Sequence, residues 1–218
     1  MPALFERERP KTLEGVVGQP PTVKKLTALQ GHGGGGWGGR AYWISGLSGT
    51  GKTTLAKIIA SDVASEFATT ETSVSQLTPK SLDDWERGLR CRCIDGKGHA
   101  LIVNEAHGLR KDTIRQFLDV LERLPDYAVV IFTTTNEGQE ALFEDCLDTA
   151  PLLSRCIRLE LLSNGKELEL AFALEARRIA QKHGLDGKPI GAYVDLVRQC
   201  KHNMRAVLQA IDSGCMAD

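Results

Sequence analysis

An α/β fold is predicted for this chain: a parallel sheet flanked by helices, followed by a small helical domain. Short apolar segments alternate with helical patterns up to about residue 163, as in sheets covered on both faces. A glycine-rich loop of the phosphate-binding type joins the first apolar segment to a helix. The remaining residues have only helical patterns. We therefore expect an α/β nucleotide-binding domain over residues 1–163 and a helical lid domain over 164–218.

Composition sets limits on the class of protein. The chain has 218 residues, of which 42% are hydrophobic and 25% are charged, and its net charge is −1. A charge this small excludes a global basic field that would draw the protein to nucleic acid or a membrane. No apolar run approaches the ~20 residues of a membrane helix, and the N-terminus lacks the apolar core of a signal peptide. We expect a cytoplasmic protein without membrane contact.

The strands of the α/β part follow from hydrophobic patterning. Residues 41–44, 100–103 and 128–132 are continuous apolar runs, which is typical of strands buried on both faces. Residues 157–161 alternate, which favours an edge strand with one solvated face. The Ser- and Thr-rich stretch 65–80 gives no clear assignment.

Helices and loops complete the prediction. Helical patterns lie around 23–29, 55–63, 81–89 and 109–124, and Pro125 ends the last of these. In the C-terminal part they cover about 166–183, a segment from near Pro189, and about 203–211. The glycine-rich tract 31–39 is expected to be a mobile surface loop that packs no core. The six cysteines include one C-x-C pair and no second pair, so reduced thiols are expected rather than a zinc site.

Residues 46–53 read GLSGTGKT, a complete G-x-x-x-x-G-K-T pattern. Its glycines allow backbone N–H groups to face phosphate oxygens, and the helix that follows presents its positive N-terminal end. Lys52 is expected to reach the β- and γ-phosphates, and the Thr53 hydroxyl to bind Mg²⁺. The sequence therefore predicts a triphosphate site, and ATP with Mg²⁺ as its ligands. Its phosphate-binding residues are Gly46, Ser48, Gly49, Thr50, Gly51, Lys52, Thr53 and Thr54.

Polar residues follow two further strands. Asn104 and Glu105 come directly after the strand 100–103. Phosphate-loop ATPases usually place an acidic pair there, one for the Mg²⁺ shell and one that orients and deprotonates the attacking water. Glu105 fits the second role, while the uncharged Asn104 could contact Mg²⁺ only through a bound water. His107 is expected to cap or pack. The polar strand tip 133–136, which includes Thr135, is expected to contact the γ-phosphate or its water.

The order of these motifs resembles the clamp-loader branch of the AAA+ ATPases, the subunits of the bacterial γ/τ complex and of replication factor C. Residues 9–12 and 16–19 resemble the family's "RPKTF…VVGQ" box along the adenine, which implies contacts from Arg9 and Val17. Residues 46–53 correspond to Walker A and 104–107 to the "DEAH" box, and Thr135 aligns with sensor 1. Ser154-Arg155-Cys156 matches the "SRC" motif, and Met204-Arg205-Ala206 resembles sensor 2.

The resemblance implies a five-stranded AAA+ sheet and ATP hydrolysis at subunit interfaces. Arg155 would reach the ATP of a neighbouring subunit, either another copy or a related AAA+ chain, while Arg205 would contact phosphate from the lid. The implied catalytic set is Glu105, Lys52, Arg155 and Thr135. A sliding clamp and primed DNA are the implied partners. The chain ends just after the lid, so we expect it to lack the family's collar domain.

Two functions stay open at this stage. The first is an ATPase that assembles with its own kind or related subunits and remodels a DNA replication or repair complex. The second is a nucleotide-gated binding module with little or no hydrolysis, because Asn104 replaces the expected acid. A small-molecule kinase is a third, weaker reading, because no acceptor pocket or Arg-rich lid is evident.

Overall fold

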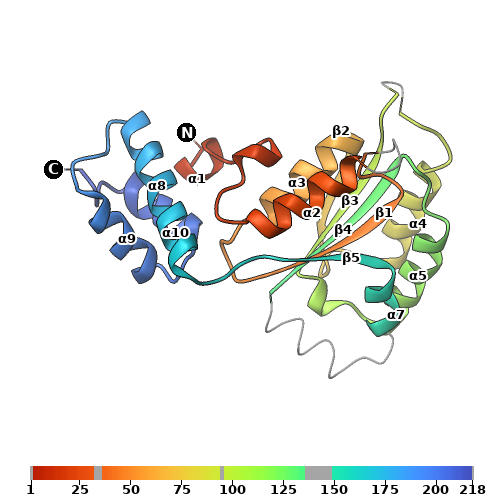
Figure 1. Cartoon of the computed structure of the whole chain (residues 1–218). Coiled ribbons are helices and arrows are strands. Elements are labelled where there is room, and N and C mark those ends of the chain that lie inside the picture. The colour runs from red at the N-terminus through yellow and green to blue at the C-terminus, as the bar shows by residue number, and fades with distance from the viewer. Residues whose placement is uncertain (1, 32–35, 94–95, 136–148, 218) are drawn as a thin grey trace.

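Five parallel strands form one sheet in the order β2-β3-β4-β1-β5 (Figure 1). The computed structural model describes residues 2–31, 36–93, 96–135 and 149–217. The five-stranded parallel sheet confirms the predicted fold class. Its strands are β1 Arg40–Ser45, β2 Ala64–Ser73, β3 Gly98–Asn104, β4 Ala128–Thr134 and β5 Cys156–Glu160.

Helices cover both faces of the sheet. One layer contains α2 (Pro20–Gly31) and α3 (Lys52–Val63), and the other contains α4 (Pro79–Gly88), α5 (Lys111–Glu122) and α7 (Thr149–Ser154). Strand β1 supplies Tyr42 and Ile44 to the first layer, whereas its Trp43 lies 5.5 Å from the Phe132 ring in the second. Burial on both sides explains why the central strands are continuous apolar runs.

The register brings the carboxyl ends of the strands to one edge. Ser45 at the end of β1 pairs with Thr134 of β4 and with Glu160 of β5, and Ser73 of β2 pairs with Asn104 of β3. The segment 46–53 leaves β1 at this edge. In open parallel sheets ligands bind outside the carboxyl ends of the strands.

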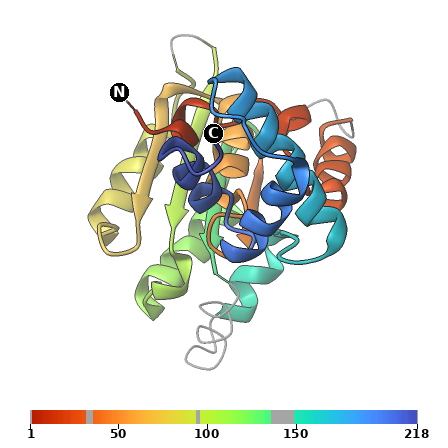
Figure 2. The same ribbon diagram turned by 90° about the vertical axis from the view of Figure 1, so that its left-hand side faces the viewer.

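The C-terminal helices α8 (Lys166–Lys182), α9 (Ile190–Gln199) and α10 (Met204–Asp212) surround a hydrophobic core of their own. The short N-terminal helix α1 (Leu4–Arg7) also packs there, and its Leu4 is fully buried. Figures 1 and 2 show this helical group beyond one end of the sheet, with α1 beside it. The domain division at residues 163 and 164 stays a prediction.

Strand β2 occupies the unassigned Ser- and Thr-rich stretch. It lies at one edge of the sheet, and only its first residue, Ala64, is buried. A register shift separates Ala64 from Thr69 along β3. Because an exposed edge strand needs no apolar periodicity, hydrophobic patterning gave no signal for it.

The glycine-rich tract contains one residue of the core. Trp37 is only 3% exposed, and its indole N–H donates to the Leu26 carbonyl over 3.0 Å. The expectation that tract 31–39 packs no core is therefore wrong for Trp37, whose large side chain fills space between α2 and the sheet. Residues 32–35 of the predicted loop lie outside the described residues.

The other predicted elements agree with the structure. Strand β5 is at a sheet edge as expected, and α5 ends three residues before Pro125. Two 3-10 turns, η1 (Leu13–Gly15) and η2 (Ala106–Gly108), complete the assignment. No helix in the described part of the chain has the length and apolar character needed to cross a bilayer.

Candidate active site

The loop between β1 and α3 has the backbone of a phosphate cradle. Gly49 and Gly51 have φ angles of +76° and +105°, which residues with a Cβ rarely adopt. Gly51 is also the N-cap of α3. The first N–H groups of a helix lack acceptors within it, so the start of α3 offers donors and positive potential to an anion.

Lys52 is held beside this cradle. Its Nζ donates to the carbonyl oxygens of Gly46, over 2.9 Å, and of Leu47, over 2.7 Å. Burial lowers the pKa of Lys52; Glu105 opposes this shift, and Arg205 adds to it. A triphosphate at this position would stabilise the charged ammonium, so binding and protonation of Lys52 would favour each other.

A cavity of about 230 Å³ lies over the cradle. The N-terminal segment, residues 48–54, the end of β3 and helices α8 and α10 all contribute to its walls. Figure 2 shows the helical group in front of the sheet at this end. The predicted site residues in its lining are Arg9, Val17, Ser48, Gly49, Thr50, Gly51, Lys52, Thr53, Thr54, Asn104, Glu105 and Arg205.

Several lining residues were not predicted from the sequence. Phe172 and Ile179, seven positions apart on α8, form an apolar wall and are 3% and 1% exposed. Their helical spacing indicates an ordinary core face, so the sequence carries no sign that a ligand cavity borders it. Four more lining residues belong to motifs that the sequence analysis singled out: Pro10, Val16, Thr133 and Met204. The further unpredicted lining residues are Phe5, Glu8, Gly15, Glu175 and Leu208.

Asn104 is fixed between two neighbouring strands. Its Nδ2 donates to Oε1 of Glu71 on β2 over 3.0 Å, and its Oδ1 accepts from the Thr133 hydroxyl on β4 over 2.8 Å. Glu71 also pairs with Lys57 of α3 over 3.0 Å. The amide of Asn104 is therefore oriented by contacts on both sides.

Glu105 has a strained backbone and an accessible carboxylate. Its φ is +59°, and its side chain is 61% exposed, with one oxygen 3.5 Å from His107 Nε2. His107 packs at the strand ends, where its Nδ1 lies 3.3 Å from the Thr134 hydroxyl. Strained residues of this kind are concentrated at functional sites.

The donor set fits Mg²⁺. Thr53, Asn104 and Glu105, which carry a hydroxyl, an amide and a carboxylate, border the same cavity. Oxygen donors are the ligands that Mg²⁺ prefers, usually with several retained waters and substrate phosphates. No group of three or more His, Cys, Asp or Glu residues suited to a metal occurs among the described residues. The ion would therefore depend on the nucleotide for much of its coordination.

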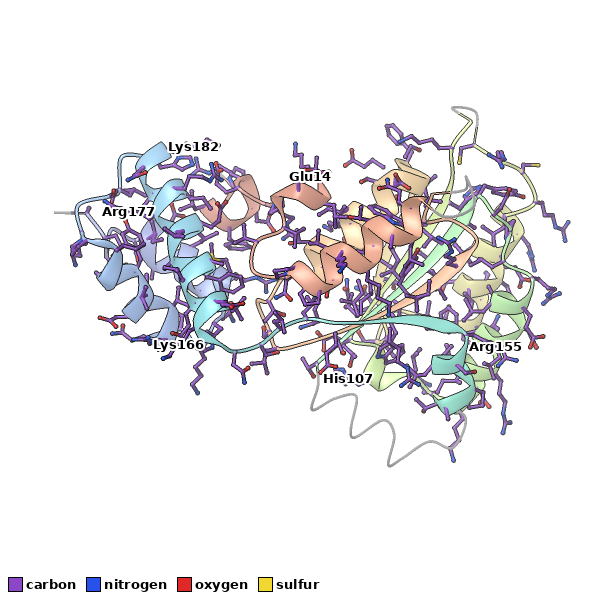
Figure 3. The ribbon with its side chains drawn as sticks, viewed as in Figure 1. Glu14, His107, Arg155, Lys166, Arg177 and Lys182 are labelled. Carbon is purple, nitrogen blue, oxygen red and sulfur yellow. The ribbon has the colours of Figure 1, made fainter. Side chains whose placement is uncertain are left out.

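Three predicted residues lie elsewhere. Gly46 does not line the cavity, although its carbonyl holds Lys52. Of the predicted strand tip 133–136, Thr133 lines the cavity and Thr135 does not, and position 136 lies outside the described residues. Arg155 is remote from the helical group, at the opposite end of the molecule in Figure 3. Its guanidinium donates to the Pro151 carbonyl over 3.1 Å and pairs with Glu122.

Helix α10, in the predicted lid, contacts the cradle directly. The backbone N–H of Met204 donates to the Gly49 carbonyl over 3.2 Å. The Asn203 side chain caps α10 by accepting from Ala206 N over 3.1 Å. A carbon added at Gly49 would lie 1.9 Å from that same Asn203 oxygen. The Arg205 guanidinium lies 5.5 Å from the centre of the Phe5 ring.

The fold and the site define a phosphate-loop α/β domain followed by a group of C-terminal helices. The family model for the ATPase family associated with various cellular activities (AAA) matches residues 42–161, more than half of the chain. The chain belongs to this AAA family. A comparison with curated protein sequences gives no match.

The fold is similar to that of RuvB. Three structures of Thermotoga maritima RuvB variants match with TM-scores of 0.72, 0.70 and 0.72 and sequence identities of 22%, 23% and 22%. The matches cover 93%, 93% and 94% of this chain, but only 63%, 63% and 64% of those chains. At this identity the likeness describes the fold alone. The clamp-loader resemblance therefore stays a prediction.

Proposed function

We propose that this chain binds ATP with Mg²⁺ in the cavity over the cradle and hydrolyses it. The observation that carries the proposal is the shared lining: the phosphate loop, Glu105 and the lid residue Arg205 border one space. Phosphoryl transfer depends chiefly on positioning and charge stabilisation, and this combination can supply both.

The lining residues have different roles in the proposed binding and hydrolysis of ATP. The cradle amides and Lys52 would bind the phosphates, while Thr53, and Asn104 through a water, would hold the Mg²⁺ ion. When bound, the ion neutralises charge that develops on the phosphate oxygens. Glu105 orients a water and accepts its proton, for which its exposed carboxylate is free to move. Arg9, Val17 and the apolar wall of α8 enclose the rest of the nucleotide.

Assembly completes the site in this proposal. Arg155 does not line the cavity of its own chain. A guanidinium suits a role in trans, because it is always charged and stabilises the transferring phosphate. The neighbour would be another copy or a related AAA+ subunit. By resemblance, the assembly would act as a clamp loader does, on a DNA replication or repair complex with a sliding clamp and primed DNA.

Asn104 favours a second function. Its amide has no formal charge, so it stabilises a divalent cation less than an aspartate would. In this alternative ATP is held with little or no hydrolysis. The contact between α10 and Gly49 would then couple nucleotide state to lid position and to the affinity for a partner.

Nucleotide binding and turnover test both functions. A fluorescent ATP analogue should bind with Mg²⁺ to the intact chain and at least 100-fold more weakly to Lys52→Ala, since Lys52 contacts the phosphates. Turnover per molecule should rise with protein concentration if assembly completes the site. Tight binding with no turnover at any concentration favours the gated module, and no binding rejects both functions.

A further inference from the structure

We propose that Glu71 is a positioning residue of the nucleotide site, which supplies from β2 the negative charge missing at Asn104. This inference rests on the proposed binding of ATP with Mg²⁺. It rests equally on the observed contact between Glu71 Oε1 and Asn104 Nδ2 at 3.0 Å.

The chemistry of the pair fixes which way the Asn104 amide faces. A carboxylate can only accept, so the NH₂ group of Asn104 must face Glu71. The amide oxygen then faces Thr133, whose hydroxyl donates to it over 2.8 Å. Because Asn104 lines the cavity, this also sets where its oxygen lies relative to a bound ion. With Glu71 removed, the amide could turn over and offer a donor to the cation.

A negative charge is present beside Asn104, but it lies on β2 rather than on β3. Glu71 carries one negative charge next to Asn104, whereas an acid at position 104 would carry it on β3. The carboxylate is kept in place by Lys57, which pairs with its other oxygen over 3.0 Å. Glu71 is itself half-exposed and does not line the cavity, so it acts through Asn104 rather than on the substrate. Hydrogen-bond partners of metal ligands orient and tune them in this way.

This arrangement has a consequence for Asn104→Asp. The change would set two carboxylates where a 3.0 Å hydrogen bond now exists, and like charges this close on neighbouring strands are destabilising. Asn104→Asp alone should therefore not strengthen Mg²⁺-dependent ATP binding while Glu71 remains. The double change Asn104→Asp with Glu71→Gln moves the charge to β3 and lets the glutamine amide donate to it.

Two readouts on the full chain test the inference. The first is the unfolding temperature without nucleotide or metal, and the second is the gain in ATP affinity on adding Mg²⁺. Glu71→Gln can still accept from Asn104, so it isolates the charge, and its Mg²⁺-dependent gain should fall about tenfold. Glu66→Gln removes the same charge from an exposed site on the same strand and should change neither readout.

The double variant Asn104→Asp with Glu71→Gln is the decisive test of the inference. Asn104→Asp alone should lower the unfolding temperature by about 2–6 °C, and adding Glu71→Gln should restore both that temperature and the Mg²⁺-dependent gain. Additive effects, or Glu71→Gln behaving like Glu66→Gln while the unaltered chain binds ATP with Mg²⁺, overturn this inference alone. An unaltered chain that binds no nucleotide overturns the proposed function and this inference with it.

Discussion

The cavity and the surface around Arg155 differ in whether their functional residues come together within one chain. At the cavity, one chain brings together the cradle, Glu105 and the lid residue Arg205. The Arg155 guanidinium, in contrast, contacts the Pro151 carbonyl and Glu122, is remote from the helical group (Figure 3) and does not line that cavity. In the proposed function, phosphate binding is therefore a property of the single chain. The Arg155 contribution would be a property of an assembly.

The largest expected effect is that of replacing Arg155, which is remote from the cavity. Arg155→Ala should lower ATP turnover by about 10³–10⁵-fold, because an arginine finger stabilises charge that appears only in the transition state. ATP affinity should change little, because Arg155 does not line the cavity of its own chain. Steady-state turnover and equilibrium binding measure the two effects.

A matched control sharpens that prediction. Arg158→Ala removes another exposed arginine close by on β5 and should leave turnover unchanged. Glu122→Gln frees Arg155 from its ion pair and should not reduce turnover. Equal losses in Arg155→Ala and Arg158→Ala would argue against a specific role for Arg155.

Glu105→Gln tests the proposed role of Glu105 at the cavity. It should slow turnover by about 10²–10⁴-fold, because the amide cannot accept a proton from water. ATP binding should persist, since the cradle is intact. Folding should also be little changed, because the side chain is 61% exposed. Single-turnover hydrolysis with bound ATP gives the rate; an unchanged rate would remove Glu105 from the mechanism.

Gly49→Ala tests the junction between cradle and lid. The added carbon meets Asn203 at 1.9 Å and must adopt a φ of +76°, so we expect a loss of about 2–4 kcal/mol in unfolding free energy. Gly184→Ala is the control, because its φ is +68° but no atom lies within 4 Å. That variant should lose only about 1–2 kcal/mol. Denaturant unfolding measures both, and equal losses would mean that the lid contact contributes nothing.

The smallest effect concerns Glu8, which lines the cavity and links α1 to the end of α8. Hydrogen bonds from His183 and then Lys182 hold the pKa of Glu8 below its ordinary 4.5. A lowered carboxyl pKa contributes stability above pH 4.5, and this is lost as pH falls through the lowered value. Glu8→Gln should therefore cost about 0.5–1 kcal/mol at pH 7 and almost nothing well below that value.

The control for this pH effect is Glu6→Gln. Glu6 pairs only loosely with Arg9, at 3.5 Å, and its side chain is 55% exposed. Unfolding curves from pH 7 to pH 3 should converge for Glu8→Gln and the unaltered chain. A constant difference across that range would contradict a role for the Glu8 charge.

The elements that the sequence predicted well are those whose signal lies in neighbouring residues. The phosphate loop is contiguous, and each buried strand is an apolar run, so neighbouring residues carry the signal. The predictions failed where the signal is not local. Strand β2 is a polar edge strand that exists because it pairs with β3, and Trp37 packs from within a tract of glycines. Within the predicted strand tip 133–136, Thr133 rather than Thr135 lines the cavity, because the register of β4 brings Thr133 beside Asn104.

The sequence by itself determined the fold class, the cradle and the residues that follow the strands, because backbone conformation and hydrophobic period are encoded by residues near one another. Only the tertiary structure decided that α1 joins the C-terminal helices, that the lid meets Gly49, and that Glu71 orients Asn104. These contacts join residues far apart in the chain. Their partners are chosen by sheet order and packing, which no local pattern specifies.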